Sequence, residues 1–143
     1  MKSDLPQIPL FKVHIAPEQE LMPRLRDVLY SGQISESEPV YNFERKFSAF
    51  AGLPNALSFY SGTAALHTAL ILAGVRQGDE VITTPMTAEP TNMAICHAGG
   101  KIVWADVDTA NGNISAGSVA ELLTPRTRAI MVVHYGGIPA SMR

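Results

Sequence analysis

The sequence of 143 residues predicts an α/β fold in which a mostly parallel sheet is covered by helices. Short apolar runs rich in β-branched residues alternate with longer runs of helix-forming residues, and short polar connections join them. This alternation favours parallel strands, because a parallel pair needs a crossover connection that a helix supplies. The composition, with 46% hydrophobic and 17% charged residues, is that of a globular chain long enough to bury a core.

Residues 1–39 are predicted to form an arm, a helix and a loop that precede the sheet domain at residues 40–143. Prolines among apolar residues make residues 1–16 an extended arm. Pro17 suits the first turn of a helix, and Gly32 ends that helix. The apolar stripe of the helix consists of Leu21, Leu25, Val28 and Leu29.

The sheet domain is expected to begin with a helix, a strand and a second helix. Val40 and the phenylalanines that follow it recur at helical spacing, and Gly52 closes this helix. Residues 56–60, Ala-Leu-Ser-Phe-Tyr, have the apolar character of a buried strand. The second helix, at residues 64–73, is rich in helix formers and ends at Gly74.

Three further strands and two further helices complete the alternation. Gly78 and Pro85 mark the limits of the first of these strands, and Gly99-Gly100 precede the second. Pro90 is tolerated in the first turn of one helix, and Ser115 can cap the other. The strands are expected at residues 81–84, 101–105 and 129–133, and the helices at residues 87–98 and 115–123.

The turn Ser61-Gly62-Thr63, between the first strand and its helix, has the features of an anion site. Gly62 lets backbone come close to a ligand, while Ser61 or Thr63 can cap the helix and donate a hydroxyl. The first amides of a helix have no partner inside it, and the helix dipole adds partial positive charge there. An ordinary capped helix start fits the same residues, so both interpretations stay open on the local sequence.

Ligands of parallel sheets collect at the carboxyl ends of the strands. His134 and Tyr135 follow the last predicted strand beside two flexible glycines, which makes them candidates to line a site. Asp106 and Asp108 do not fit a calcium loop, because Asn111 stands where that loop needs glycine, and we expect them to cap backbone amides. The residues expected at this edge are 61–63, 84–87, 106–108 and 134–137.

Several classes of function are excluded by the sequence. It contains neither the phosphate loop G-x-x-x-x-G-K-[ST] nor the dinucleotide fingerprint G-x-G-x-x-G. Cys96 is the single cysteine, so we expect no disulfide and no metal site. A net charge of -2 without a Lys/Arg cluster argues against nucleic acid as a partner. No signal peptide or membrane-spanning run is present, and we expect a cytoplasmic protein with no membrane partner.

Taken together, several short segments resemble the pyridoxal 5'-phosphate (PLP)-dependent sugar aminotransferases of the family named after DegT, DnrJ, EryC1 and StrS. Each segment alone is a weak signal, but their order and spacing match the family through most of the chain. The segments are Ser31-Gly32-Gln33, Val40 with Phe43-Glu44, Ser61 to Leu66, Gly78 to Ile82, Asp106-Val107-Asp108 with Asn113-Ile114, Thr124 to Thr127, and Val133-His134-Tyr135 with Gly137 and Pro139.

The resemblance implies the amino-terminal portion of the large domain of a fold-type I PLP enzyme, the aspartate aminotransferase-like fold. It implies that Ser61, Gly62 and Thr63 bind the cofactor phosphate, in agreement with the argument from the helix start. Ala88 stands where many members have an aromatic residue that stacks on the cofactor ring, which places this chain in a separate branch. Site-lining roles are expected for Thr87, His134 and Tyr135.

The reaction that the resemblance implies moves an amino group, usually from glutamate, to the keto group of a nucleotide-linked sugar, in a homodimeric enzyme. In the family, the lysine that forms the Schiff base with the cofactor follows the segment that matches residues 134–137. None of the lysines in this sequence matches it, so we expect no catalytic residue within this chain and no turnover by the chain alone.

The strand at residues 56–60 is expected to lack a partner, because in the family it pairs with later strands, while the second, third and fourth strands lie together. We therefore expect an amino-terminal part of a larger enzyme. Three other interpretations remain: a PLP-dependent sugar dehydratase, a non-catalytic oligomerisation scaffold, and an unrelated binder of small phosphate compounds.

Overall fold

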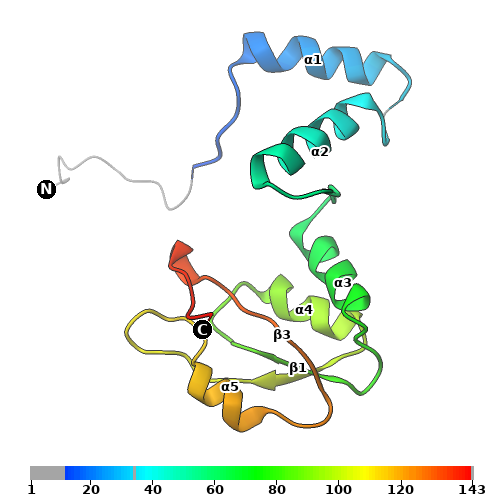
Figure 1. The fold of residues 1–143 in the computed structure, drawn as a ribbon. Coiled ribbons are helices and arrows are strands. Elements are labelled where there is room, and N and C mark those ends of the chain that lie inside the picture. The colour runs from blue at the N-terminus through cyan, green and yellow to red at the C-terminus, as the bar shows by residue number, and fades with distance from the viewer. Residues whose placement is uncertain (1–11, 34, 143) are drawn as a thin grey trace, which may run out of the picture. The chain divides into compact units, whose positions relative to one another are not determined.

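The computed structural model describes residues 12–33 and 35–142, which divide into two compact units that meet in sequence at Leu57 and Ser58 (Figure 1). Most of the predicted arm, residues 1–11, lies outside the described residues. The predicted division between residues 39 and 40 concerns a domain of a complete enzyme and stays a prediction.

The first unit contains the two helices that the glycine and proline positions predict. α1 (Glu18–Tyr30) begins directly after Pro17, and Gly32 follows its end with a φ of +75°. α2 (Glu38–Ala51) ends at Gly52, whose φ of +66° is the left-handed conformation that favours glycine. Neither helix contains a buried residue, and the large apolar side chains of both, such as Leu29 and Phe50, are exposed in the described part of the chain.

The second unit is built on a parallel sheet of three strands in the order β2-β1-β3. The predicted fold class is confirmed, and so is the expectation that these three strands lie together. β3 starts at Thr127, two residues earlier than the predicted strand at residues 129–133. The reason is that the amide of Glu80 already pairs with the carbonyl of Arg126 at 2.9 Å. The bounds are Glu80–Thr83 for β1, Lys101–Trp104 for β2 and Thr127–Ile130 for β3.

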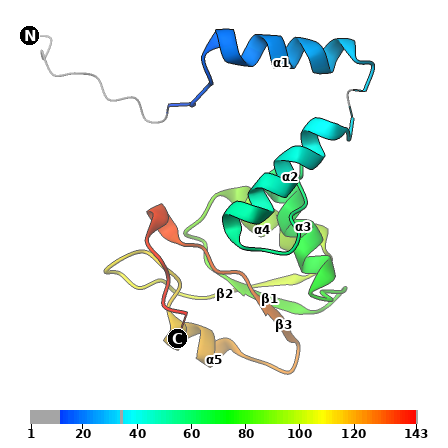
Figure 2. The same ribbon diagram turned by 45° about the horizontal axis from the view of Figure 1, so that its top comes forward.

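Helices cover both faces of this sheet. Figures 1 and 2 show α3 (Gly62–Leu72) and α4 (Glu89–His97) on one face and α5 (Ala116–Leu122) on the other. A short 3-10 turn, η1 (Tyr135–Gly137), follows β3. The core between the sheet and α3 and α4 consists of Leu70, Val75, Val81, Ala94, Ile95, Ala98 and Met131, with Leu66 packed against it.

The predicted strand at residues 56–60 is wrong for this chain. The segment is not in the sheet, and its side chains are open: Tyr60 is 95% exposed and Leu57 is 65% exposed. A strand exists only as part of a hydrogen-bonded ladder, and none of the described strands pairs with this segment. The apolar composition of the segment is therefore not sufficient to make it a strand, because no described strand offers it a partner.

At the amino-terminal edge of the sheet, Glu80 is buried in a polar cluster, with 3% of its surface exposed. The hydroxyl of Thr124 donates to Oε2 at 2.6 Å, and Nε and Nη2 of Arg126 donate to Oε1 at 3.0 and 2.7 Å. The hydrogen bond from Thr124 and then those from Arg126 lower the pKa of the Glu80 carboxyl below its ordinary value of 4.5. This cluster joins β1 to the connection that enters β3.

We expect the contribution of Glu80 to stability to be lost in acid. Because its folded pKa lies below 4.5, the contribution is fully present above that pH and declines as the pH falls through the folded pKa. The measurement is the difference in free energy of unfolding between the wild type and Glu80→Gln, followed from about pH 6 to about pH 3. A difference that does not change with pH would contradict this account of the cluster.

Candidate functional site

The first turn of α3 has the predicted cap. Ser61, with extended backbone (φ −156°, ψ 154°), precedes the helix, and its Oγ accepts the amide of Ala64 at 3.1 Å. Its carbonyl accepts the amide of Ala65 at 3.2 Å. The amides of Gly62 and Thr63 donate no hydrogen bond to any residue that the structure describes. Ser61 therefore occupies the cap, and the next two amides stay available for a ligand.

The other end of α3 is fixed at the amino-terminal edge of the sheet. Nε of Arg128, near the start of β3, donates to the carbonyl of Ala73 at 3.0 Å, directly after the helix. With 11 residues, α3 is about 16 Å long, so its first turn lies well away from that edge. A Cβ added at Gly62 would meet no atom within 4 Å. Gly62 is exposed, so a ligand can reach this helix start, and its two unpaired amides fit an anion such as a phosphate group.

The connection from β1 to α4 carries Thr87 and Ala88. The hydroxyl of Thr87 donates to Oγ1 of Thr91 at 2.9 Å, and Ala88 is the exposed residue that directly precedes α4. Asn92 holds this connection: its Oδ1 accepts the hydroxyl of Thr83 at 2.8 Å, and its Nδ2 donates to the carbonyl of Thr84 at 3.1 Å. The sequence reasoning missed Asn92, because a polar residue in a predicted helix gives no local sign of such a role.

His134 and Tyr135 follow β3 after three intervening residues, because the strand ends at Ile130 and not at the predicted residue 133. Nδ1 of His134 accepts the amide of Ala140 at 3.0 Å, and the amide of Tyr135 donates to Oδ1 of Asn113 at 2.9 Å. Asp108 caps backbone as expected, since its Oδ1 accepts the amide of Ala110 at 2.8 Å. Asn113 is a second residue that the sequence reasoning did not single out for the site.

Two pockets, of about 430 and 470 Å³, are lined by the loop that follows β2. The larger one brings Met86, beside Thr87, together with that loop and with Tyr135. Ser61, Gly62 and Thr63 are not among the residues that line either pocket. The described residues therefore form part of a site at the carboxyl-terminal edge of the sheet. The start of α3 is a separate surface that lines neither pocket.

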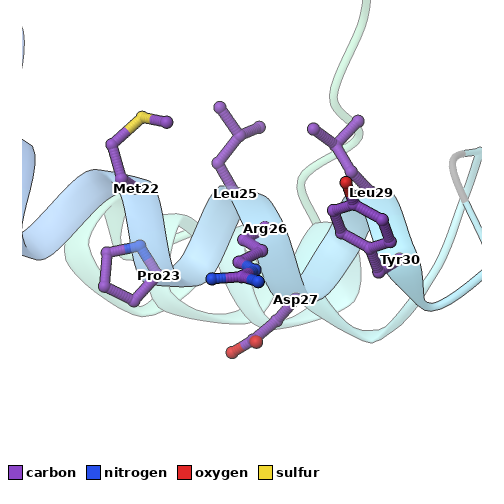
Figure 3. A pocket seen from close by; sticks show the side chains of 7 residues that line it. All are labelled: Met22, Pro23, Leu25, Arg26, Asp27, Leu29 and Tyr30. Atoms are coloured by element: carbon purple, nitrogen blue, oxygen red, sulfur yellow. The ribbon is translucent and has the colours of Figure 1, made fainter.

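The hollow shown in Figure 3, with a volume of about 750 Å³, lies along α1 and is not a candidate for a catalytic or binding site. All of its lining residues come from α1, where Met22, Leu25 and Leu29 point to one side and Asp27 to the other. It is the open flank of a single helix and not an enclosed site. Within the described residues, no three potential ligands gather to hold a metal ion, and no helix is long and apolar enough to cross a bilayer.

Comparison with known proteins gives consistent matches. Residues 16–143 match the DegT/DnrJ/EryC1/StrS aminotransferase family. The spore coat polysaccharide biosynthesis protein SpsC of Bacillus subtilis (strain 168) is 40% identical over 124 residues, which are 87% of this chain and 32% of that protein. GDP-perosamine synthase of Caulobacter vibrioides is 33% identical over 138 residues, 95% of this chain and 37% of that protein.

A solved structure agrees with these sequence matches. The crystal structure of the sugar aminotransferase CalS13 from Micromonospora echinospora matches with a TM-score of 0.87 at 40% identity, over 94% of this chain and 36% of that chain. The chain thus spans about a third of the length of the relatives it matches. Its fold is the amino-terminal part of a fold-type I PLP enzyme, and the chain belongs to the DegT/DnrJ/EryC1/StrS aminotransferase family.

Proposed function

We propose that this chain is the part of a PLP-dependent sugar aminotransferase that binds the cofactor phosphate. The observation that carries the proposal is the start of α3, where the amides of Gly62 and Thr63 donate no hydrogen bond to a described residue and Gly62 is exposed. These amides and the Thr63 hydroxyl would hold the phosphate, while Ser61 keeps the turn in place through its bond to Ala64. When bound, PLP supplies an electron sink for the carbanion formed beside the amino nitrogen.

Four other residues are proposed to line the site. Ala88 offers only a methyl group in front of α4, so a planar ring would make an apolar contact there and no aromatic stack. Thr87 is held by Thr91, and Tyr135 is held through its backbone amide, so both have fixed places. The imidazole of His134 is exposed at the end of β3, with Nδ1 engaged by backbone. These residues orient ligands and carry no bond-breaking step.

For the complete protein we propose transfer of an amino group from glutamate to the keto group of a nucleotide-linked sugar. Family membership supports an aminotransferase of sugars, and the names of SpsC and GDP-perosamine synthase are consistent with this substrate class. A cytoplasmic location is proposed because the free, exposed thiol of Cys96 suits a reducing compartment. A homodimer is proposed because the apolar flank of α1 (Figure 3) is uncovered within the described residues.

The catalytic lysine is proposed to belong to the part of the protein outside this chain. Lys46 lies on the first unit's α2, and Lys101 begins β2 at the edge of the sheet opposite to the carboxyl ends. Lys101 therefore lies at the other edge of the sheet from Ala88 and His134, which follow the carboxyl ends of β1 and β3. The chain by itself would then bind ligands without turnover.

The test compares the complete protein with the 143-residue chain. We expect the complete protein, given glutamate and a nucleotide-linked keto sugar, to form 2-oxoglutarate and an aminated sugar, and the chain alone to form neither. Mass spectrometry of the sugar product decides between the alternatives. Loss of water without gain of nitrogen would indicate a dehydratase, and a complete protein that binds PLP but turns over no keto sugar would indicate a scaffold; both results contradict the proposal.

A further inference from the structure

One buried side chain holds both ends of the turn that follows β3. Asn113 is 2% exposed and lies in the loop after β2. Its Oδ1 accepts the amide of Tyr135 at 2.9 Å, and its Nδ2 donates to the carbonyl of Ile138 at 3.1 Å. The turn at residues 135–138 is therefore closed by a single carboxamide that lies more than twenty residues earlier in the chain.

Asn113 is itself fixed by its own loop. The backbone amide of Asn113 donates to Oδ1 of Asn111 at 2.8 Å, and the backbone carbonyl of Asn113 accepts the amide of Asp108 at 2.8 Å. An antiparallel bridge between Val107 and Ile114 closes this loop around it. Rigid support of this kind lets a buried amide impose its geometry on the groups that it contacts.

The ring of Tyr135 packs against the same loop. Gly112 has a φ of +75°, and a Cβ added there would lie 3.0 Å from Cδ1 of Tyr135. Only glycine leaves room for the ring at this distance and adopts this backbone conformation without strain. The contact adds a side-chain constraint to the backbone bonds made by Asn113.

His134, at the entrance of the turn, has a defined tautomer. Its Nδ1 lies 3.0 Å from the amide nitrogen of Ala140, a residue that is 6% exposed. Because the amide supplies the proton, Nδ1 is the acceptor, and the neutral imidazole carries its own proton on Nε2. The exposed side of His134 is therefore an N–H donor.

We infer that Asn113 is a positioning residue for the turn at residues 135–138 and for the residues on either side of it, from His134 to Ala140. Through Asn113, His134 presents Nε2–H as a hydrogen-bond donor to an oxygen of the bound ligand. This assigns His134 a donor role in place of a general-base role. The inference rests on the proposed function in one respect, that a ligand binds at the carboxyl edge of the sheet. Preorganised donors of this kind lower the cost of ordering a site when its ligand arrives.

The first test is backbone amide hydrogen exchange in the 143-residue chain, with Asn113→Ala and the matched control Asn111→Ala. In Asn113→Ala we expect the amides of Tyr135 and Ala140 to exchange at least about tenfold faster, because the turn opens. The control removes one hydrogen bond that supports Asn113 but keeps both bonds made by its carboxamide, so it is expected to leave the amides of Tyr135 and Ala140 better protected than Asn113→Ala does. The amide of Val81 in β1 reports whether the sheet stays folded. Equal protection of Tyr135 and Ala140 in all three proteins would overturn the inference.

The second test is a long-range proton–nitrogen correlation spectrum of His134, which distinguishes the two tautomers. The wild type is expected to show protonated Nε2 and unprotonated Nδ1, and Asn113→Ala a mixture of both tautomers. A protonated Nδ1 in the wild type, or an unchanged tautomer in a folded Asn113→Ala protein, would overturn the inference that Asn113 positions His134.

If Asn113→Ala does not fold, Asn113→Asp keeps the acceptor for the Tyr135 amide and removes the donor to Ile138. Faster exchange at Ala140 with retained protection at Tyr135 would support the inference, and unchanged exchange at Ala140 would overturn it. These measurements need no cofactor, so their failure is distinct from failure of the proposed function.

Discussion

Gly62→Pro is expected to weaken the binding of pyridoxamine 5'-phosphate at least about tenfold while α3 stays folded. Proline removes the amide of Gly62, and a hydrogen bond to a charged group contributes about 1.5 to 3 kcal/mol. The helix tolerates the change, because proline is favoured at the first helical position and the extended backbone of Ser61 suits a residue before proline. Pyridoxamine 5'-phosphate is the chosen probe because it has no aldehyde that could react with surface lysines. Isothermal titration calorimetry measures the affinity.

Two controls separate the loss of the amide from other effects. Pyridoxamine, which lacks the phosphate, should bind the wild type and Gly62→Pro with equal affinity. Thr63→Val keeps both amides and the shape of the side chain, and should weaken binding less than Gly62→Pro does. Equal affinity of the wild type and Gly62→Pro for the phosphate compound would mean that the phosphate is held elsewhere.

Ile95→Ala is expected to lower the free energy of unfolding of the second unit by about 2 to 5 kcal/mol. Ile95 is fully buried in α4 and belongs to the core cluster with Val75 and Val81. Its Cγ2 lies 3.1 Å from the position that a Cβ at Gly100 would occupy, so backbone packs closely against it. Because small domains are stable by about 5 to 15 kcal/mol, this loss is a large share of the total. Urea unfolding followed by circular dichroism measures it.

The matched control is Ile71→Ala on α3. Ile71 is 51% exposed and has no place in the core cluster, so its replacement should change the free energy of unfolding by less than about 1 kcal/mol. If the two variants lost similar stability, the packing of α3 and α4 on the sheet would not be the source of stability in this unit.

The helices and the sheet of the second unit were predictable because their signals are local. Ser61 and Ser115 cap α3 and α5 as expected, each accepting the amide three residues later. Gly52 and Gly74, with positive φ, end α2 and α3 at the predicted places. The prediction of a strand at residues 56–60 was wrong because that signal is not local. An apolar run becomes a strand only when a partner strand pairs with it.

The places of the candidate site residues were predictable only at a helix start or after a strand. Ser61, Gly62 and Thr63 form the expected turn, and His134 and Tyr135 follow β3. The roles of Asn92 and Asn113 depend on contacts with β1 and with the turn after β3, which no local pattern reports. The local sequence around an asparagine does not show which groups its carboxamide will contact after folding.

The central claim, that the start of α3 binds the cofactor phosphate, is tested most directly by nuclear magnetic resonance of the backbone amides. The chain is titrated first with pyridoxamine 5'-phosphate and then, in a separate sample, with pyridoxamine. The account predicts large shifts of the Gly62 and Thr63 amide signals with the phosphate compound and none with pyridoxamine. Shifts of the same size with both compounds, or shifts confined to other parts of the chain, would contradict it.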